Sequence, residues 1–170
     1  MALTLDDLTL VSLWIHVPLV TAWIGLVIFD VIAMLAPGLD LRQRAHLLAW
    51  SRPFVPIAIP VIIATGVWQT IHNPLGDIPS IAALEALRER TAYGQALFWK
   101  HGCVLATFAL TTYVHYRLVP RLSMSVAAPT SHVMREDIQL ERSVLWLSLL
   151  NAGACLGALL LATRMVWSLH

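Results

Sequence analysis

The sequence carries very little charge. Only 12% of its 170 residues are Asp, Glu, Lys or Arg, whereas a soluble domain usually has about 25%. Its hydrophobic share is high, at 58%. This composition excludes an ordinary soluble domain and indicates an integral membrane protein. The net charge of +1 gives no reason to expect nucleic acid as a partner.

Cysteine is scarce, and the N-terminal segment lacks the basic residues of a secretion signal. Cys103 and Cys155 both fall in apolar stretches, so we expect two small buried side chains rather than a disulfide framework. The start, MALTLDD, is followed by an apolar run that is longer than the core of a signal peptide. We therefore interpret this run as a retained membrane span.

Four apolar stretches are long enough to cross a bilayer, which takes about 20 residues of helix. They cover about residues 8–36, 53–72, 96–119 and 143–167, and a proline follows each of the first three. The sequence therefore predicts one all-α domain over residues 1–170, a transmembrane four-helix bundle with up-down-up-down topology. In the outer loop, residues 73–95, the segment 78–90 has apolar residues at helical spacing and predicts a short surface helix.

Basic residues favour one orientation in the membrane, because cytoplasmic loops carry the excess of Lys and Arg. The first and third connections share one side and hold seven such residues, namely Arg42, Arg44, Arg52, Arg117, Arg121, Arg135 and Arg142. The opposite side holds four, namely Arg88, Arg90, Lys100 and Arg164. We therefore expect both termini on the outer side, and we expect the protein in the inner membrane of a bacterium.

Two histidines begin spans that should run in the same direction. His16 and His101 each lie a short distance inside a span, so a bundle would hold them at nearly the same depth. Ionisable groups inside a bilayer are costly and usually functional. We therefore expect a metal or a haem between these two residues. His72 at the end of the second span, with the cations Lys100 and Arg164, should converge on the same side of the membrane.

The same spacing leads to a second layer. Asp30 follows His16 by 14 residues, and His115 follows His101 by 14 residues. Fourteen residues make nearly four turns, so each pair lies on one helix face, about 21 Å apart along the axis. If the two faces meet, an outer layer of His16 and His101 stands above an inner layer of Asp30 and His115. The inner layer could serve a second haem or a proton path, or Asp30 could pair with an arginine at the inner interface.

Haem b is the cofactor that the outer layer predicts. It is held without covalent bonds by axial imidazoles from facing helices. His16 and His101 would be its ligands, with Lys100 and Arg164 near the propionates. Such a protein transfers electrons, so we expect a redox partner or a larger membrane complex. Copper is the alternative, with His16, His101 and Met165 as ligands, because Cu(I) prefers imidazole and soft sulfur ligands.

Several short motifs resemble the membrane domain of the CopD copper-resistance proteins. They are LWIHVPLVTAWIGLVIF in the first span, Thr65-Gly66 in the second, TAYGQALFWKHG at the entry to the third and HYRLVPRL at its exit. The similarity covers about residues 11–165 and implies copper binding or transport across the inner membrane. The pattern is also similar to the HemJ type of protoporphyrinogen oxidase. That resemblance implies haem binding, with His16 and Lys100 at the positions of the family's first-helix histidine and third-helix lysine.

The sequence does not decide whether the protein is an enzyme. A scaffold without a cofactor is a further alternative, in which the histidines only form hydrogen bonds between helices. The Gly153–Gly157 pair is a small-xxx-small motif, which predicts close helix packing or a homodimer. Apart from membrane lipid, the sequence therefore predicts protein partners of two kinds, a redox partner and a second copy of the chain.

Overall fold

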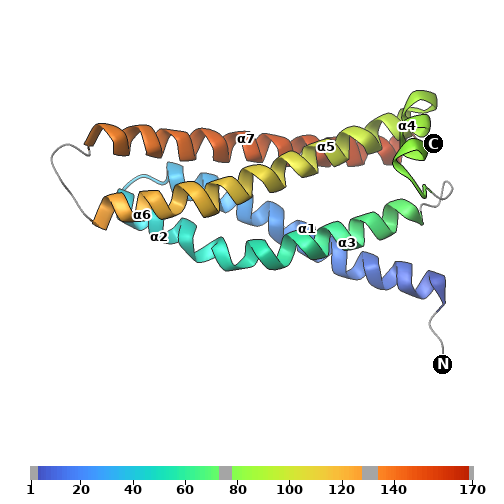
Figure 1. Cartoon of the computed structure of the whole chain (residues 1–170), viewed down its shortest axis with the longest axis horizontal. Helices are drawn as coiled ribbons and strands as arrows, with labels where there is room; N and C mark the ends of the chain where they lie inside the picture. Colours follow the sequence, from blue (N-terminus) through green and yellow to red (C-terminus); the bar gives the residue numbers. More distant parts are fainter. Residues whose placement is uncertain (1–3, 73–77, 128–133, 169–170) are drawn as a thin grey trace.

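The computed structural model describes residues 4–72, 78–127 and 134–168, and in these residues all regular secondary structure is helical. Residues 73–77 of the predicted outer loop, and residues 128–133 of the third connection, lie outside the described part. Four long helices run side by side along the longest axis of the molecule (Figure 1). They are α1 (Leu5–Leu35), α3 (Val55–Ile71), α5 (Ala92–Tyr113) and α7 (Met134–Trp167).

Shorter helices occupy the two ends of this bundle. At one end, which we call the terminal end, α1 begins, α7 ends and the short helix α4 (Ile81–Arg90) packs on α5 (Figure 1). The opposite end, the α2–α6 end, holds α2 (Leu41–Ser51) and α6 (Val119–Ala127). The predicted surface helix is confirmed as α4, although it begins at residue 81 rather than 78 because the Ser80 side chain caps its N-terminus.

Three segments are long and apolar enough to cross a membrane, and they indicate an integral membrane protein. These segments are Leu5–Leu35, Leu41–Ile71 and Ile138–Trp167. The sequence predicted four spans, and α5 is the one that does not reach the same hydropathy. Its first half carries Gln95, Lys100 and His101, and polar side chains of this kind lower the mean hydropathy of a helix.

Two predicted helix boundaries are wrong, and in both cases the chain stays helical through a proline. Residues 37–52 were expected to form a loop, but α2 occupies most of them and continues through the short 3-10 helix η1 (Arg52–Phe54) into α3. Pro120 was expected to end the third helix, but α5 continues through the π-helical turn η2 (Val114–Leu118) into α6. Pro53 and Pro120 both lie in the first turn of a helix, where the missing N–H has no partner to lose.

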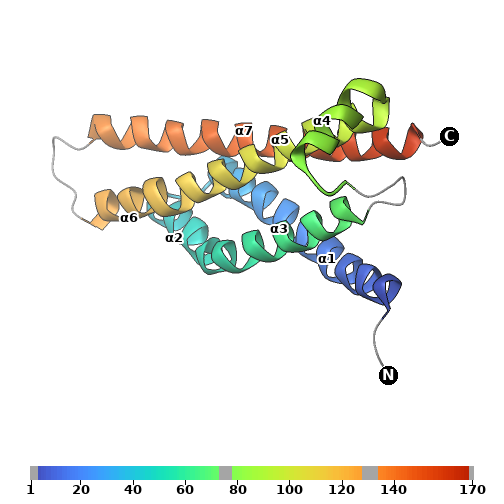
Figure 2. The ribbon, with the colours of Figure 1, turned by 45° about the vertical axis from the view of Figure 1, so that its right-hand side comes forward.

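The bundle is not equally tight along its length. In both views α1 diverges from α5 and α7 toward the terminal end (Figures 1 and 2). An apolar middle cluster fills the centre and consists of Trp23, Val27, Val55, Ala58, Ile62, Phe108 and Cys155. A second one, the α2–α6 cluster, consists of Met34, Leu48, Val114, Leu118, Val119 and Val144. Both cysteines are free, and Cys155 is buried as expected, whereas Cys103 is only partly buried.

Helix α4 is held against α5 by a close backbone approach. A Cβ atom on Gly94 would overlap the Leu87 carbonyl group and would lie 2.7 Å from the Arg88 nitrogen. Only glycine fits there. The Arg88 guanidinium also lies over the Phe98 ring, 4.7 Å from its centroid. The terminal end of α5, which carries Lys100 and His101, is thereby covered by α4.

Candidate functional site

His16 of α1 is fixed against α3 through one ring nitrogen. Its Nδ1 lies 2.8 Å from Thr65 Oγ1, and the Thr65 hydroxyl donates in turn to the Val61 carbonyl at 2.7 Å. The Thr65 hydroxyl has two acceptors within reach, the Val61 carbonyl oxygen and His16 Nδ1, and when its hydrogen is on the Val61 carbonyl the imidazole donates from Nδ1. The lone pair of His16 is then on Nε2. A Cβ atom on Gly66 would lie 3.2 Å from His16 Cε1, so this glycine lets the ring approach α3.

His101 of α5 is fixed in the same way. Its Nδ1 lies 2.7 Å from the Leu97 carbonyl oxygen, which can only accept, so the ring donates from Nδ1. Its Nε2 lies 3.2 Å from Thr70 Oγ1. The Thr70 hydroxyl has another acceptor, the Gly66 carbonyl at 2.8 Å, so it can leave Nε2 without losing its hydrogen bond. The lone pair on His101 Nε2 is therefore available to a ligand.

The two imidazoles share α3 as a neighbour and Lys100 as a nearby cation. Thr65 and Thr70, which hold them, are five residues apart on α3. Both rings lie within electrostatic range of the Lys100 ammonium group. Among the described hydrogen bonds and ring contacts, none joins His16 directly to His101. The structure thus brings the predicted residues His16, His101 and Lys100 to one region of the terminal end.

Among the described contacts, none joins the other predicted residues of this end to the two imidazoles. His72 caps the C-terminus of α3 and packs on the Trp68 ring, with a centroid distance of 4.4 Å. Arg164 is exposed, and Met165 packs against the apolar side chains of Ile78 and Leu97. Within the described residues, no three His, Cys, Asp or Glu side chains are grouped in a way that could hold a metal ion.

A polar interface between α1 and α3 surrounds His16, and the sequence reasoning missed it. Ser12 Oγ donates to the Thr65 carbonyl at 3.2 Å, and Trp68 Nε1 donates to Thr9 Oγ1 at 3.3 Å. A pattern in the sequence could have predicted it, because Thr9, Ser12 and His16 follow one another at a spacing of three and four residues and so lie on one helix face. These contacts hold α1 against α3 where α1 diverges from α5 and α7.

The predicted inner pair is observed. His115 Nε2 lies 2.9 Å from Asp30 Oδ2, and the two side chains are 0% and 4% exposed. The alternative, in which Asp30 pairs with Arg117 or Arg52, is not observed among the described ion pairs, where His115 is the partner of Asp30. His115 belongs to the π-helical turn η2, a kind of distortion that is frequent at functional sites.

Between the two levels, the faces of α1 and α5 meet through aromatic side chains. Trp23 and Phe108 pack edge to face with ring centroids 5.2 Å apart. Trp23 lies seven residues from both His16 and Asp30, and Phe108 lies seven residues from both His101 and His115. The aromatic contact and the Asp30–His115 pair confirm that the stripes inferred from the 14-residue spacing face each other over this part of the bundle.

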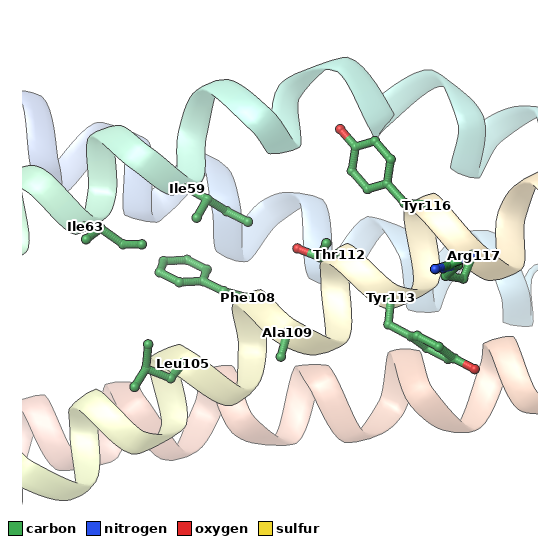
Figure 3. Close-up of a pocket in the computed structure, with 9 residues that line it drawn as sticks. All are labelled: Ile59, Ile63, Leu105, Phe108, Ala109, Thr112, Tyr113, Tyr116 and Arg117. Atoms are coloured by element: carbon green, nitrogen blue, oxygen red, sulfur yellow. The ribbon is translucent and has the colours of Figure 1, made fainter.

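Next to Phe108, an open groove runs between α3 and α5 (Figure 3). It has a volume of about 460 Å³, and Figure 3 shows Ile59 and Ile63 of α3 opposite Phe108 of α5. Its remaining lining residues are Leu105, Ala109, Thr112, Tyr113, Tyr116 and Arg117. Neither His16 nor His101 lines this groove, so it is separate from the histidine site.

Comparison of the chain with protein-family models, with curated proteins and with solved structures gave no match. The resemblance to the CopD and HemJ patterns therefore stays a prediction. The proposed function therefore depends on the geometry at the level of His16 and His101 and at the level of Asp30 and His115.

Proposed function

We propose that the protein is a membrane-embedded b-type haem protein that transfers electrons, with Nε2 of His16 and Nε2 of His101 as the axial ligands. The observation that carries this proposal is the state of the two rings. Each imidazole has its Nδ1 at hydrogen-bond distance from a fixed oxygen, of Thr65 or of Leu97, and a hydrogen donated there leaves the lone pair on Nε2. Metal-binding histidines are usually oriented by a hydrogen bond of this kind from the other ring nitrogen.

The residues of the terminal end fit a haem in their donor chemistry. Two neutral imidazoles are the axial ligands of many b-type haems, and the haem iron, when bound, supplies one-electron oxidation and reduction. In this chain, Thr65 and Leu97 orient the two ligands. The Lys100 ammonium group, which lies within electrostatic range of both rings, would attract the carboxylates of the propionates.

The proposed arrangement in the membrane has four spans, with α5 as the span of lower hydropathy, and both termini on the outer side of a bacterial inner membrane. Its support is the distribution of charge. The α2–α6 end carries the basic residues Arg42, Arg44, Arg52, Arg117, Arg121 and Arg142. An excess of basic residues marks the cytoplasmic side. The histidine site would then lie in the outer half of the membrane, and its redox partner would approach from that side or laterally.

Copper is less well supported than haem as the ligand of this site. Met165, the proposed soft ligand, is packed among the apolar side chains of Ile78 and Leu97. Cys103 lies close to α7, because a Cβ atom on Gly157 would be 3.4 Å from its Sγ. The protoporphyrinogen oxidase alternative has no support beyond the resemblance at His16 and Lys100.

The test is the visible spectrum of the protein purified in mild detergent, oxidised and then reduced with dithionite. We expect a Soret band that shifts on reduction and sharp α and β bands from a six-coordinate haem. Both features should disappear in His16→Ala and in His101→Ala. They should persist in His46→Ala, a control at an exposed histidine of α2. A colourless wild-type protein, or bands that survive both ligand substitutions, would refute the proposal.

A further inference from the structure

Asp30 and His115 belong to a layer of five buried polar side chains. This buried polar layer consists of Asp30, Thr111, His115, Ser148 and Asn151, which come from α1, α5, η2 and α7 and are each at most 3% exposed. Besides the Asp30–His115 bond, the layer contains a hydrogen bond of 2.7 Å from Asn151 Nδ2 to Thr111 Oγ1. Burial of so many polar groups is costly unless each one has a partner.

Helix geometry places Ser148 at the level of the Asp30–His115 pair. Thr111 and Asn151 are in contact, so they lie at one level of the antiparallel helices α5 and α7. His115 lies four residues further along α5, and Ser148 lies three residues back along α7. Both steps lead toward the α2–α6 end, by about 6 Å and about 4.5 Å at 1.5 Å per residue.

Apolar side chains close the layer on both sides along the bundle axis. Val27, Phe108 and Cys155 of the middle cluster lie about one turn toward the terminal end. Met34, Leu118 and Val144 of the α2–α6 cluster lie one turn toward the other end. The layer is therefore an isolated polar compartment inside an apolar bundle. The ionic side chains nearest to the layer have partners outside it. Arg44 pairs with Glu141, and the Arg52 guanidinium lies over the Tyr116 ring.

The hydrogen bonds within the layer leave a matched set of groups unused. Among the described residues, Asp30 Oδ1, His115 Nδ1, Ser148 Oγ and Asn151 Oδ1 are buried and have no partner. The two oxygens Asp30 Oδ1 and Asn151 Oδ1 are acceptors, and the Ser148 hydroxyl has a hydrogen to donate. Donors and acceptors thus remain together in one closed compartment, although no protein group is in place to join them.

We propose that the buried polar layer binds internal water, which joins the Asp30–His115 pair to Ser148 and Asn151. A buried water typically makes two to four hydrogen bonds to polar groups of this kind. Water matches these groups because one water molecule can accept from the Ser148 hydroxyl and donate to Asp30 Oδ1 or Asn151 Oδ1. The inference does not depend on the proposed haem, since none of these five residues belongs to the histidine site at the terminal end.

Infrared difference spectroscopy on protein reconstituted into lipid nanodiscs tests this inference. Exchange of the bulk solvent for water labelled with heavy oxygen should shift an O–H stretching band in the wild type. That band should be lost or displaced in Ser148→Ala, which removes a single hydroxyl group, and in Asp30→Asn. It should be unchanged in Ser143→Ala, a matched control at an exposed serine of α7.

Three results would overturn the inference. The layer is dry if no wild-type band responds to the labelled water. The water lies elsewhere if the band is the same in Ser148→Ala and in Asp30→Asn. The site is one for a cation if sodium chloride raises the Tm above that in choline chloride and Asp30→Asn abolishes this rise. Because the haem spectrum is measured separately, failure of this inference is distinguishable from failure of the proposed function.

Discussion

Replacing His115 by leucine should destabilise the protein far more than replacing both members of its pair. The side chains of His115 and Asp30 are 0% and 4% exposed, so bulk water cannot solvate a carboxylate that has lost its partner. Removing one partner of a buried ion pair costs about 3–5 kcal/mol, because the other charge stays buried without compensation. We therefore expect His115→Leu to lower the free energy of unfolding by about that amount.

The double variant, with leucine at both positions, should recover most of this loss. It keeps no buried charge, and a hydrogen bond between membrane helices is worth only about 1–2 kcal/mol. The assay is reversible unfolding in mixed micelles at increasing SDS, followed by circular dichroism, for the wild type, both single variants and the double variant. If the effects of the two single substitutions simply add in the double variant, Asp30 and His115 do not act as a pair and the reasoning is refuted.

Three further predictions concern contacts at other levels. Gly94→Ala should release α4 from α5 and speed amide hydrogen exchange in residues 81–90, and unchanged exchange there would contradict the steric argument. Gly66→Ala should displace the His16 ring by a few tenths of an ångström and alter the spectrum of a haem bound to it, whereas Gly25→Ala, which meets open space, should not. Arg44→Gln should weaken the packing of α2 on α7 through loss of the Glu141 pair, seen as faster exchange in α2 but not in α4.

The sequence predicted the inner level better than the outer one. The 14-residue spacing placed Asp30 and His115 on facing stripes because α1 is a regular helix, and α5 stays regular up to the turn that carries His115. The outer pair follows the same spacing, yet the two rings contact α3 instead of each other. The divergence of α1 from α5 toward the terminal end causes this difference, and no local pattern in the sequence predicts it.

Helix ends and small polar residues were the parts that pattern reasoning missed. Pro120 reads as a stop signal, but its place in the first turn of α6 depends on the π-helical turn before it. Ser148 and Asn151 are single polar residues in an apolar span, and such residues often face neighbouring helices for packing alone. Their role in the buried polar layer depends on contacts across the bundle, with Thr111 and with the level of His115.

Titration of the haem-free protein with haemin tests the central claim most directly. The protein would be purified from haem-depleted cells and followed by its Soret absorbance as haemin is added. Our account predicts saturation at one equivalent of haemin per chain, with His16→Ala and His101→Ala each failing to form the six-coordinate spectrum and His46→Ala titrating like the wild type. A titration without a saturation point, or one that is the same in all four proteins, would contradict the assignment of His16 and His101 as haem ligands.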